Sequence, residues 1–344
     1  MSPILSIGIT SYKRVKELVR CLNSIQTKYV DDIEIIVSED SSPLSEEIKK
    51  TVERVAENSQ YNIRFTTNTK NLGYDMNLGS IIKKCQGKYI FFMSDDDCIY
   101  TGCLDKIIQF LKREECIIKS ENSDSGYGYG VLYGPFIYSS DGRRDRFRGE
   151  NFSIPKGEDS ASKYIYDSIL FSGLIFRREY VNGFKADRFK NHNYFQVYMF
   201  LQMLYRYGGY YFGFPTVIYV GDGENAYGIS ESSGGNDILA NRESIISNLE
   251  FNKTLIKVIK MFDADEGCHV MDSFSKQYSL HSYSGLSIAR GNGMQYFRKY
   301  WDTLNTLDIR FTPIIKCYYV ILLIFGERKS NRMTNFFRNI LKKE

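Results

Sequence analysis

The chain has 344 residues, of which 43% are hydrophobic and 25% charged, so it has the composition of a globular protein with a sizeable core. A formal net charge of +4 is too small to indicate nucleic-acid binding, and we expect no nucleic-acid partner. The seven cysteines form no C-x-x-C pair and the first residues carry no signal-peptide pattern, which argues against a zinc site or a disulfide framework and favours a cytoplasmic protein.

In the first third of the chain, apolar runs alternate with helical patterns. Runs rich in β-branched and aromatic residues predict strands at 4–10, 33–38, 62–67 and 88–94. Apolar residues at helical spacing predict a helix over 15–25. A second helix is expected after the second strand, with Ser42 as its N-cap and Pro43 at its first position. This alternation predicts an α/β fold, a Rossmann-like and mostly parallel sheet with helices on both faces.

Polar motifs follow the predicted strands at their carboxyl ends. They read TSYKR at 10–14, SEDSS at 38–42, TKNLG at 69–73 and SDDDC at 94–98. Because the carboxyl ends of parallel strands share one edge of a sheet, and ligands of such sheets bind there, we expect the four motifs to converge on a single site.

Three consecutive acids, Asp95 to Asp97, end a hydrophobic strand in the segment YIFFMSDDDCIY. Adjacent carboxylates repel one another, so stability alone would not place them at the end of a buried element. Carboxylates facing a cleft most simply hold Mg²⁺ or Mn²⁺, which shares its coordination with substrate phosphates and stabilises a diphosphate leaving group. An isolated acidic triplet is more often a solvated turn. Its position among the other strand-end motifs favours the metal site.

Beyond residue 115 the pattern changes, and the sequence predicts three regions, 1–115, 116–235 and 236–344. In the second region we expect a loop at 121–130, strands at 131–140, 172–178 and 210–220, and helices at 160–171 and 194–208. The third region is predicted to be helical, with breaks near Gly267, Gly291 to Gly293 and Pro313.

Taken together, these motifs resemble those of the family 2 glycosyltransferases with the GT-A fold. The resemblance is carried by SIGITSYKR, IEIIVSEDSS, NLGYDMNLG and above all GKYIFFMSDDD, and SGLIFRREYVNGF at 172–184 extends it. It implies that 1–115 is the nucleotide-sugar-binding half of a GT-A domain and 116–235 the acceptor-binding half. The implied activity is transfer of a sugar from a nucleoside-diphosphate sugar, with a UDP-sugar as the expected donor, to an acceptor hydroxyl by direct displacement with inversion.

The resemblance also implies a set of donor-site residues drawn from the four motifs. They are Thr10, Tyr12, Arg14, Asp40, Asn71, Gly73, Asp95, Asp96 and Asp97. Those of the first motif would line the nucleotide pocket, Asp40 would accept a hydrogen bond from the base, and those of the third motif would lie near the ribose and diphosphate. Each also has a structural interpretation, for example Tyr12 as a rim aromatic and Asp40 as a turn residue.

The aspartate motif departs from the usual family pattern of an aspartate, a spacer and two aspartates. Aligning on the strand places Ser94 at the first acid and leaves Asp96 and Asp97 as the matching pair. The other register pairs Asp95 with Asp97, and these two are our expected ligands for Mn²⁺ or Mg²⁺. Some family members read S-D-D-D here, so the departure concerns the roles of the acids more than the function.

The catalytic base is not where the family places it. Inverting members use a carboxylate at the start of the helix before the last strand, where this chain has Gln196. His192, just upstream, is the first candidate because an imidazole accepts protons near neutral pH, although it has an equal interpretation as a surface residue. Asp222 is the second, together with Glu224, in a Gly/Ser-rich loop expected to be a lid over the donor. Asp187 is a weaker candidate.

The C-terminal segment 311–344 joins an apolar run at 317–325 to a basic stretch with interspersed apolar residues. The run is too short to span a bilayer, but a basic amphipathic helix can lie on an anionic membrane surface. The other interpretation is a helix packed on the body of the protein. Because family members often act on lipid-linked oligosaccharides for bacterial surface polysaccharides such as O-antigen or capsule, we expect such an acceptor and a peripheral position on the inner face of the cytoplasmic membrane.

Two other functions stay open at this point. A sugar nucleotidyltransferase usually carries a Gly-rich, Arg-containing phosphate loop after the first strand, and TSYKRVKE contains no glycine. A non-catalytic protein that binds nucleotide sugars would keep the fold and lose the base. A hydride-transfer enzyme is excluded more firmly, because no G-x-G-x-x-G follows the first strand.

Overall fold

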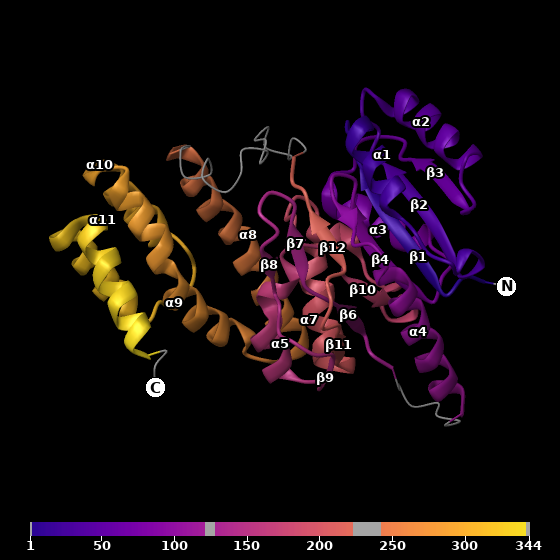
Figure 1. Ribbon diagram of the computed structural model, residues 1–344. Coiled ribbons are helices and arrows are strands. Elements are labelled where there is room, and N and C mark those ends of the chain that lie inside the picture. The colour runs from indigo at the N-terminus through magenta and orange to yellow at the C-terminus, as the bar shows by residue number, and fades with distance from the viewer. Residues whose placement is uncertain (1, 121–127, 223–241, 342–344) are drawn as a thin grey trace. The chain divides into compact units, whose positions relative to one another are not determined.

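A computed structural model describes residues 2–120, 128–222 and 242–341, with backbone alone for 119–120, 242–248, 250 and 333–341 (Figure 1). The chain forms two compact units, Met1–Ser232 and Ser233–Glu344. Most of the loop predicted at 121–130 and of the predicted lid lies outside the described residues. The division of the first unit into two halves at residue 115 stays a prediction.

The first unit begins with a parallel sheet whose strands agree with the predicted ones to within a residue. β1 (Leu5–Ser11) lies between β2 (Ile33–Glu39) and β4 (Tyr89–Ser94), and β3 (Ile63–Thr67) pairs with β2. Thr10 of β1 is in register with Ser38 of β2 and Ser94 of β4, so the three strands end at the same level. The polar motifs therefore begin at one edge of the sheet.

Helices cover both faces of this sheet, as predicted. α1 (Val15–Ser24), α2 (Ser45–Glu57) and α4 (Cys103–Ser120) share an apolar core with alternate residues of the strands, including Ile7 and Ile35. α3 (Tyr74–Lys84) packs on the opposite face, where Ile81 lies against Gly8 of β1.

The start of α2 differs from the prediction. Ser42 is not its N-cap: the Ser42 hydroxyl accepts a hydrogen bond from the N–H of Leu44 (3.2 Å), and its carbonyl accepts one from Ser45 (3.1 Å). These bonds form a tight turn before the helix, which begins at Ser45. Serine side chains bond equally well to turns and to helix ends, and the turn prevails here.

The sheet continues beyond β4 into an antiparallel and mixed part. Its order is β3-β2-β1-β4-β10-β6-β11-β9, and the added strands are β6 (Val131–Tyr133), β9 (Phe152–Ile154), β10 (Ile175–Arg177) and β11 (Gly209–Tyr211). A second sheet has the order β5-β12-β7-β8, with β5 (Cys98–Ile99), β7 (Phe136–Tyr138), β8 (Arg144–Asp145) and β12 (Val217–Tyr219). The antiparallel strand β10 links the parallel half to the rest.

Two segments predicted as single strands, 131–140 and 210–220, are each divided between the two sheets. β6 and β11 pair in the large sheet, and their continuations β7 and β12 pair in the small one. The breaks fall at Gly134 and Gly213, where the two segments and their neighbours pass closely: a Cβ on Gly134 would lie 2.8 Å from the carbonyl oxygen of Phe214. A proline follows each break, at positions 135 and 215, and cannot donate to a ladder.

The helices of this part are short apart from one. They are α5 (Glu158–Tyr164), α6 (Arg178–Val181) and α7 (Phe195–Tyr207), with 3₁₀ turns η2 (Ile165–Ser168) and η3 (Ala186–Phe189); a further 3₁₀ turn, η1 (Val30–Asp32), precedes β2 in the parallel part. The helix predicted at 160–171 is α5 continued by η2, and it ends at Ser168. The predicted buried helix is confirmed as α7, in which ten consecutive residues from Phe195 to Leu204 are buried.

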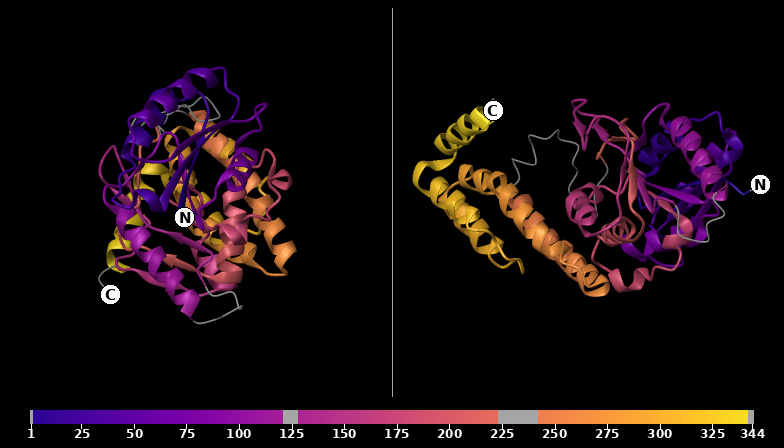
Figure 2. Two further views of the ribbon diagram at one scale, coloured as in Figure 1. Left: turned by 90° about the vertical axis from the view of Figure 1, so that its right-hand side faces the viewer. Right: turned by 90° about the horizontal axis from the view of Figure 1, so that it is seen from below.

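The second unit is helical, and the predicted breaks are confirmed. α8 (Arg242–Glu266), α9 (Val270–Gly291), α10 (Met294–Leu304) and α11 (Ile314–Leu341) are separated at Gly267, Gly293 and Pro313, and α9 packs against the other three (Figure 2). α11 is kinked at Gly326, whose φ of 70° is left-handed. Within the described ranges, no helix has both the length and the apolarity to cross a membrane.

Candidate active site

The three acids that end β4 are buried at the carboxyl edge of the sheet and face Arg14. Asp95, Asp96 and Asp97 are 1%, 9% and 1% exposed. Arg14, the residue before α1, places its Nη1 2.9 Å from both Asp95 Oδ1 and Asp96 Oδ2. The N–H of Tyr12 also donates to Asp95 Oδ2 (3.2 Å). At this edge Arg14 therefore supplies one positive charge against three carboxylates.

Asp97 is held by residues from the other half of the unit. The Ser172 hydroxyl donates to its Oδ2 (2.6 Å), and the N–H of Val220 donates to its Oδ1 (3.1 Å). Ser172 also accepts a hydrogen bond from the N–H of Ser94 (3.1 Å). Because Ser172 precedes β10 and Val220 follows β12, both sheets contribute to the position of this acid.

Burial makes the ionised forms of these acids unfavourable. It raises the pKa of Asp95 to about 7, although Arg14 opposes the shift. Burial and the neighbouring Asp96 raise the pKa of Asp97 as well. A cation beside the acids would favour their ionised forms, so the electrostatics favour a positively charged ligand.

The donor set fits a divalent cation in its chemistry, but not as a cage of protein ligands. Carboxylate oxygens are what Mg²⁺ and Mn²⁺ prefer, and Asp96 offers the most exposed of the three side chains. Both oxygens of Asp95 and of Asp97 already accept protein hydrogen bonds. Among the described residues, no group of three or more His, Cys, Asp or Glu side chains is arranged to hold a metal. A cation here would take most of its ligands from a diphosphate and water.

Asp40, at the end of β2, organises the loop of the third motif. Its Oδ1 accepts hydrogen bonds from Asn68 Nδ2 (2.8 Å) and the N–H of Leu72 (2.9 Å), and its Oδ2 accepts one from the N–H of Gly73 (2.8 Å). Asn71 Oδ1 accepts from the same Gly73 N–H (3.0 Å). The structure thus brings Asp40, Asn71 and Gly73 together, and it gives the Asp40 carboxylate a structural task in the loop.

The first motif completes this edge. Thr10 lies in the strand register between the ends of β2 and β4, and Tyr12 is 39% exposed, with Lys13 Nζ 5.1 Å from the centre of its ring. The predicted convergence of the four motifs is confirmed.

His192 lies in the loop before α7, which is fastened by Asp75. This acid, in the first turn of α3, accepts hydrogen bonds from the N–H groups of His192 (3.0 Å), Asn193 (2.8 Å) and Phe195 (3.0 Å). Burial raises the pKa of Asp75, although the three bonds oppose the shift. Asp75 is not among the site residues predicted from the sequence. Its position inside the NLGYDMNLG motif was the available signal.

The other candidates for a base are less suited to accept a proton. Both oxygens of Asp222 accept hydrogen bonds from Arg20 (2.6 Å each), and this pairing lowers the pKa of Asp222. Gln196 is buried, and its Oε1 has no hydrogen-bond partner within the described residues. Glu224 lies outside the described residues, and Asp187 is exposed in η3.

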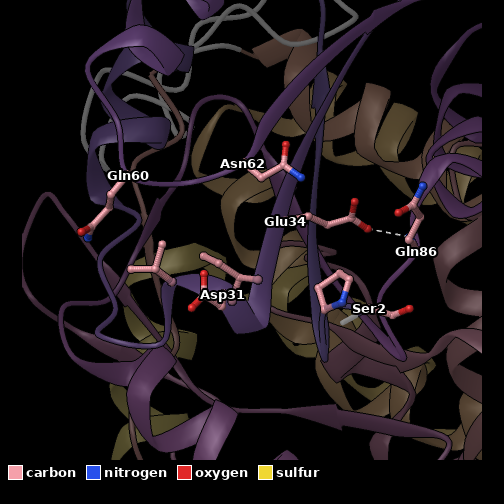
Figure 3. A pocket seen from close by; sticks show the side chains of 9 residues that line it. Ser2, Asp31, Glu34, Gln60, Asn62 and Gln86 are labelled. Carbon is pink, nitrogen blue, oxygen red and sulfur yellow. Dashed lines mark hydrogen bonds between the residues drawn. The ribbon is translucent and has the colours of Figure 1, made fainter.

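A cavity of about 580 Å³ lies at the opposite edge of the sheet, near the amino ends of β1 and β2 (Figure 3). Its lining is mostly polar, and Glu34 is its buried charged group. The Glu34 carboxylate accepts hydrogen bonds from the Ser6 hydroxyl (2.6 Å), the Gln86 N–H (2.5 Å) and Arg64 (2.9 Å). Because these bonds satisfy the carboxylate, and ligands of such sheets bind at the other edge, we do not place the donor here.

Comparisons with known proteins include the part of the chain that contains the four strand-end motifs. The sequence model described as Glycosyl transferase family 2 matches residues 6–157. The chain is 27% identical over 209 residues to the GalNAc(5)-diNAcBac-PP-undecaprenol beta-1,3-glucosyltransferase of Campylobacter jejuni. This match covers 57% of the chain and 64% of that relative, so the chain spans less than two thirds of the relative's length.

Solved structures show the same fold at low identity. S. aureus TarS 1-349 in complex with UDP-GlcNAc is 14% identical, with a TM-score of 0.52 over 91% of each chain. The same protein in complex with UDP is 13% identical, with a TM-score of 0.50 over 91% of this chain and 90% of that one. At this identity the likeness concerns the fold alone, and it confirms the predicted α/β architecture.

Proposed function

We propose that this chain, whose residues 6–157 match the sequence model of family 2 glycosyltransferases, transfers a sugar from a nucleoside-diphosphate sugar to a hydroxyl of a glycan acceptor. We propose a UDP-sugar as the donor. The acceptor hydroxyl would attack the anomeric carbon as its proton passes to a base, and the bond to the nucleoside diphosphate would break in the same displacement.

The observation that carries the proposal is the edge at which β1, β2 and β4 end together. It gathers the buried acids Asp95 to Asp97 and the loop that Asp40 organises. Three acids with one arginine between them suit a ligand that brings its own cation, as a nucleoside diphosphate does. The nucleotide would lie between the acids and the Asp40 loop, along Thr10, Tyr12 and Arg14.

We propose Mn²⁺ or Mg²⁺ as the cofactor, held through Asp96 together with Asp95 or Asp97. Asp96 is favoured because its side chain is the most exposed and its bonds are to the side chains of Arg14 and Ser94, which can turn away. When bound, the metal would offset the charge of the departing diphosphate. Arg14 would share that task from the side of α1.

For the acceptor we propose a lipid-linked oligosaccharide, as the name of the Campylobacter relative describes for that protein. The second unit supports a peripheral position on a membrane. Exposed apolar residues of α11, Val320 (48%), Ile324 (66%) and Phe325 (46%), are followed in the chain by exposed basic residues such as Arg328 and Lys329. Such a surface suits the interface of an anionic membrane.

The test of the donor site is a thermal-shift series on the full chain. UDP, GDP, CDP and dTDP are each added with Mn²⁺, with Mg²⁺ or with EDTA. A ligand at a hundred times its dissociation constant stabilises the folded state by about 2.7 kcal/mol, which is measurable. We expect UDP to raise the Tm in the presence of metal, and Asp96→Ala to abolish this shift.

The matched control is Asp31→Ala, an exposed acid beside the cavity at the opposite edge. It should leave the nucleotide shift intact. If no nucleotide shifts the Tm under any condition, the acids are a structural turn and the proposed function is wrong. If nucleotide binds but no sugar is transferred or hydrolysed, the chain binds nucleotide sugars without catalysis.

A further inference from the structure

The segment DGRRDRFRGE, residues 141–150, has no role in the site described so far. It carries four arginines within six residues, at 143, 144, 146 and 148, and forms the turn and second strand of the β7–β8 hairpin (Figure 1). We call residues 136–148 the arginine hairpin. The density of guanidinium groups raises the question of which charges they balance.

A close internal ion pair accounts for one of the four, and a second arginine has only a long, exposed contact with an acid. Arg148 binds Asp167, with Nη2 2.7 Å from the carboxylate. Arg143 is 3.9 Å from Asp141 at an exposed position. Within the described residues, Arg144 and Arg146 have no carboxylate within 4 Å, although Asp167 and Asp145 are near enough to Arg146 to attract its charge. Arg144 lies over the ring of Phe147, 5.1 Å from its centre.

The backbone holds Arg146 in a strained conformation. Its φ of 58° is left-handed, which is unfavourable for a residue other than glycine. Three hydrogen bonds keep it there: its N–H donates to Asp145 (2.7 Å), and its carbonyl accepts from the Tyr211 hydroxyl (2.6 Å) and from Arg148 Nη1 (3.2 Å). Strain maintained in this way is typical of positions where a side chain must point in a particular direction.

That direction is towards the segment that supports the acidic cluster. The Arg146 guanidinium lies 5.0 Å from the ring centre of Phe136, and its Nη2 is 3.4 Å from the carbonyl oxygen of Leu170. Two residues further on, Ser172 donates its hydrogen bond to Asp97. Arg146 and Asp97 therefore contact opposite ends of the same short segment, residues 170–172.

The sheet order sets a distance between the hairpin and the donor acids. β8 is the third neighbour of β5, which follows Asp97 directly, and three strand spacings amount to roughly 14 Å. An anion on the hairpin would therefore be separate from a diphosphate at Asp96. It would lie on the side of the predicted acceptor-binding half, 116–235, which contains β7 and β8.

We propose that Arg143, Arg144 and Arg146 bind the diphosphate that joins the glycan acceptor to its lipid, which deepens and rests on the proposed function. Guanidinium groups bind phosphate oxygens through paired, charge-assisted hydrogen bonds. Phe147, 49% exposed at the same place, offers an apolar contact for the carbon chain beyond the diphosphate. The hairpin thus selects an acceptor by the charge at its reducing end, while the reacting hydroxyl lies at the acids.

The experiment is a calorimetric titration of the full chain with geranyl diphosphate, in EDTA and again with the donor site saturated by UDP and Mn²⁺. Wild type should bind in both conditions. The double variant Arg143→Ala, Arg144→Ala and the single variant Arg146→Lys should bind on the order of tenfold to a hundredfold more weakly, as expected for lost or misplaced hydrogen bonds to a charged ligand. Arg54→Ala, an exposed arginine of α2, is the matched control and should bind as wild type does.

The exposed double variant keeps the test decisive should the Arg146 variant fail to fold. Equal binding by wild type and double variant overturns the proposal, and so does an equal loss of UDP binding, which would place the arginines in the donor site. Binding to phosphatidylglycerol vesicles that depends on the arginines, without binding of geranyl diphosphate, also overturns it in favour of a membrane headgroup. Failure of the proposed function is distinguishable, because it removes the nucleotide shift and leaves these titrations unaffected.

Discussion

The first two candidates for the base, His192 and Asp222, differ in what their proton-accepting atoms already contact. Both Asp222 oxygens are bound by Arg20, whose charge lowers the pKa of the acid. His192 is fixed through its backbone by Asp75, and its Nδ1 lies 3.2 Å from the carbonyl oxygen of Lys190. In the described structure Nε2 has no hydrogen-bond partner, so it is the atom able to accept the proton of a hydroxyl.

We therefore predict that His192→Ala lowers kcat by about a hundredfold to ten-thousandfold, the usual contribution of a general base. KM for the donor and the nucleotide-dependent Tm shift should stay as in wild type, because the imidazole is not part of the proposed donor site. Steady-state release of nucleoside diphosphate measures both constants. Asp222→Asn serves as the comparison, and a larger loss of kcat in this variant than in His192→Ala would reverse the assignment.

The residues proposed for the donor site lie within local motifs and could be predicted from the sequence, whereas the residues that contact them from distant parts of the chain could not. Asp40, Asn71 and Gly73 could be grouped because each follows a recognisable strand. Ser172 and Val220 are 75 and 123 residues from Asp97 in the chain. Their contact with it depends on the pairing of β10 with β4 and of β12 with β5. Such contacts have no periodicity that a single sequence reveals.

At the level of elements, the sequence predicted what periodicity encodes and missed where strands change sheets. The parallel strands and α7 are evident as uniform apolar or amphipathic runs. The apolar runs at 131–140 and 210–220 are equally uniform, and their division depends on close contacts of Gly134 and Gly213 with other segments. Those contacts form only in the folded chain.

Gly213→Ala should therefore destabilise the first unit. A Cβ there would lie 2.2 Å from the carbonyl oxygen of Gly149, which is backbone and cannot turn away as a side chain would. We expect a loss of roughly 1–3 kcal/mol, the usual range for overpacking, measured by urea unfolding. Gly183→Ala is the control, since nothing lies within 4 Å of the added carbon, and it should unfold at the wild-type midpoint. Equal midpoints for both variants would contradict the prediction.

At the scale of the whole molecule, the sequence indicated a GT-A body followed by helices, and the break points of the helices were correct. The kink of α11 at Gly326 was not predicted, because a glycine within a helical pattern is compatible with both a straight and a broken helix. The kink separates an apolar part of α11 from a basic part. Side chains of the basic amphipathic segment beyond residue 332 lie outside the described ones, so the membrane proposal rests on the residues before them.

Those residues allow a direct test of membrane association. Ile324 and Phe325 are 66% and 46% exposed, and burying either side chain in a bilayer interface would contribute about 1.5–3 kcal/mol. The double variant Ile324→Asp, Phe325→Asp should therefore reduce co-sedimentation of the full chain with phosphatidylglycerol-containing vesicles at least about tenfold. Leu280→Asp alters an equally exposed apolar residue of α9, at 54%, and should bind vesicles as wild type does. Because the basic residues that follow Phe325 in the chain act through charge, binding should also weaken in high salt and with neutral vesicles. If co-sedimentation is unchanged in the double variant and does not depend on the lipid charge, this face of α11 does not contact the membrane.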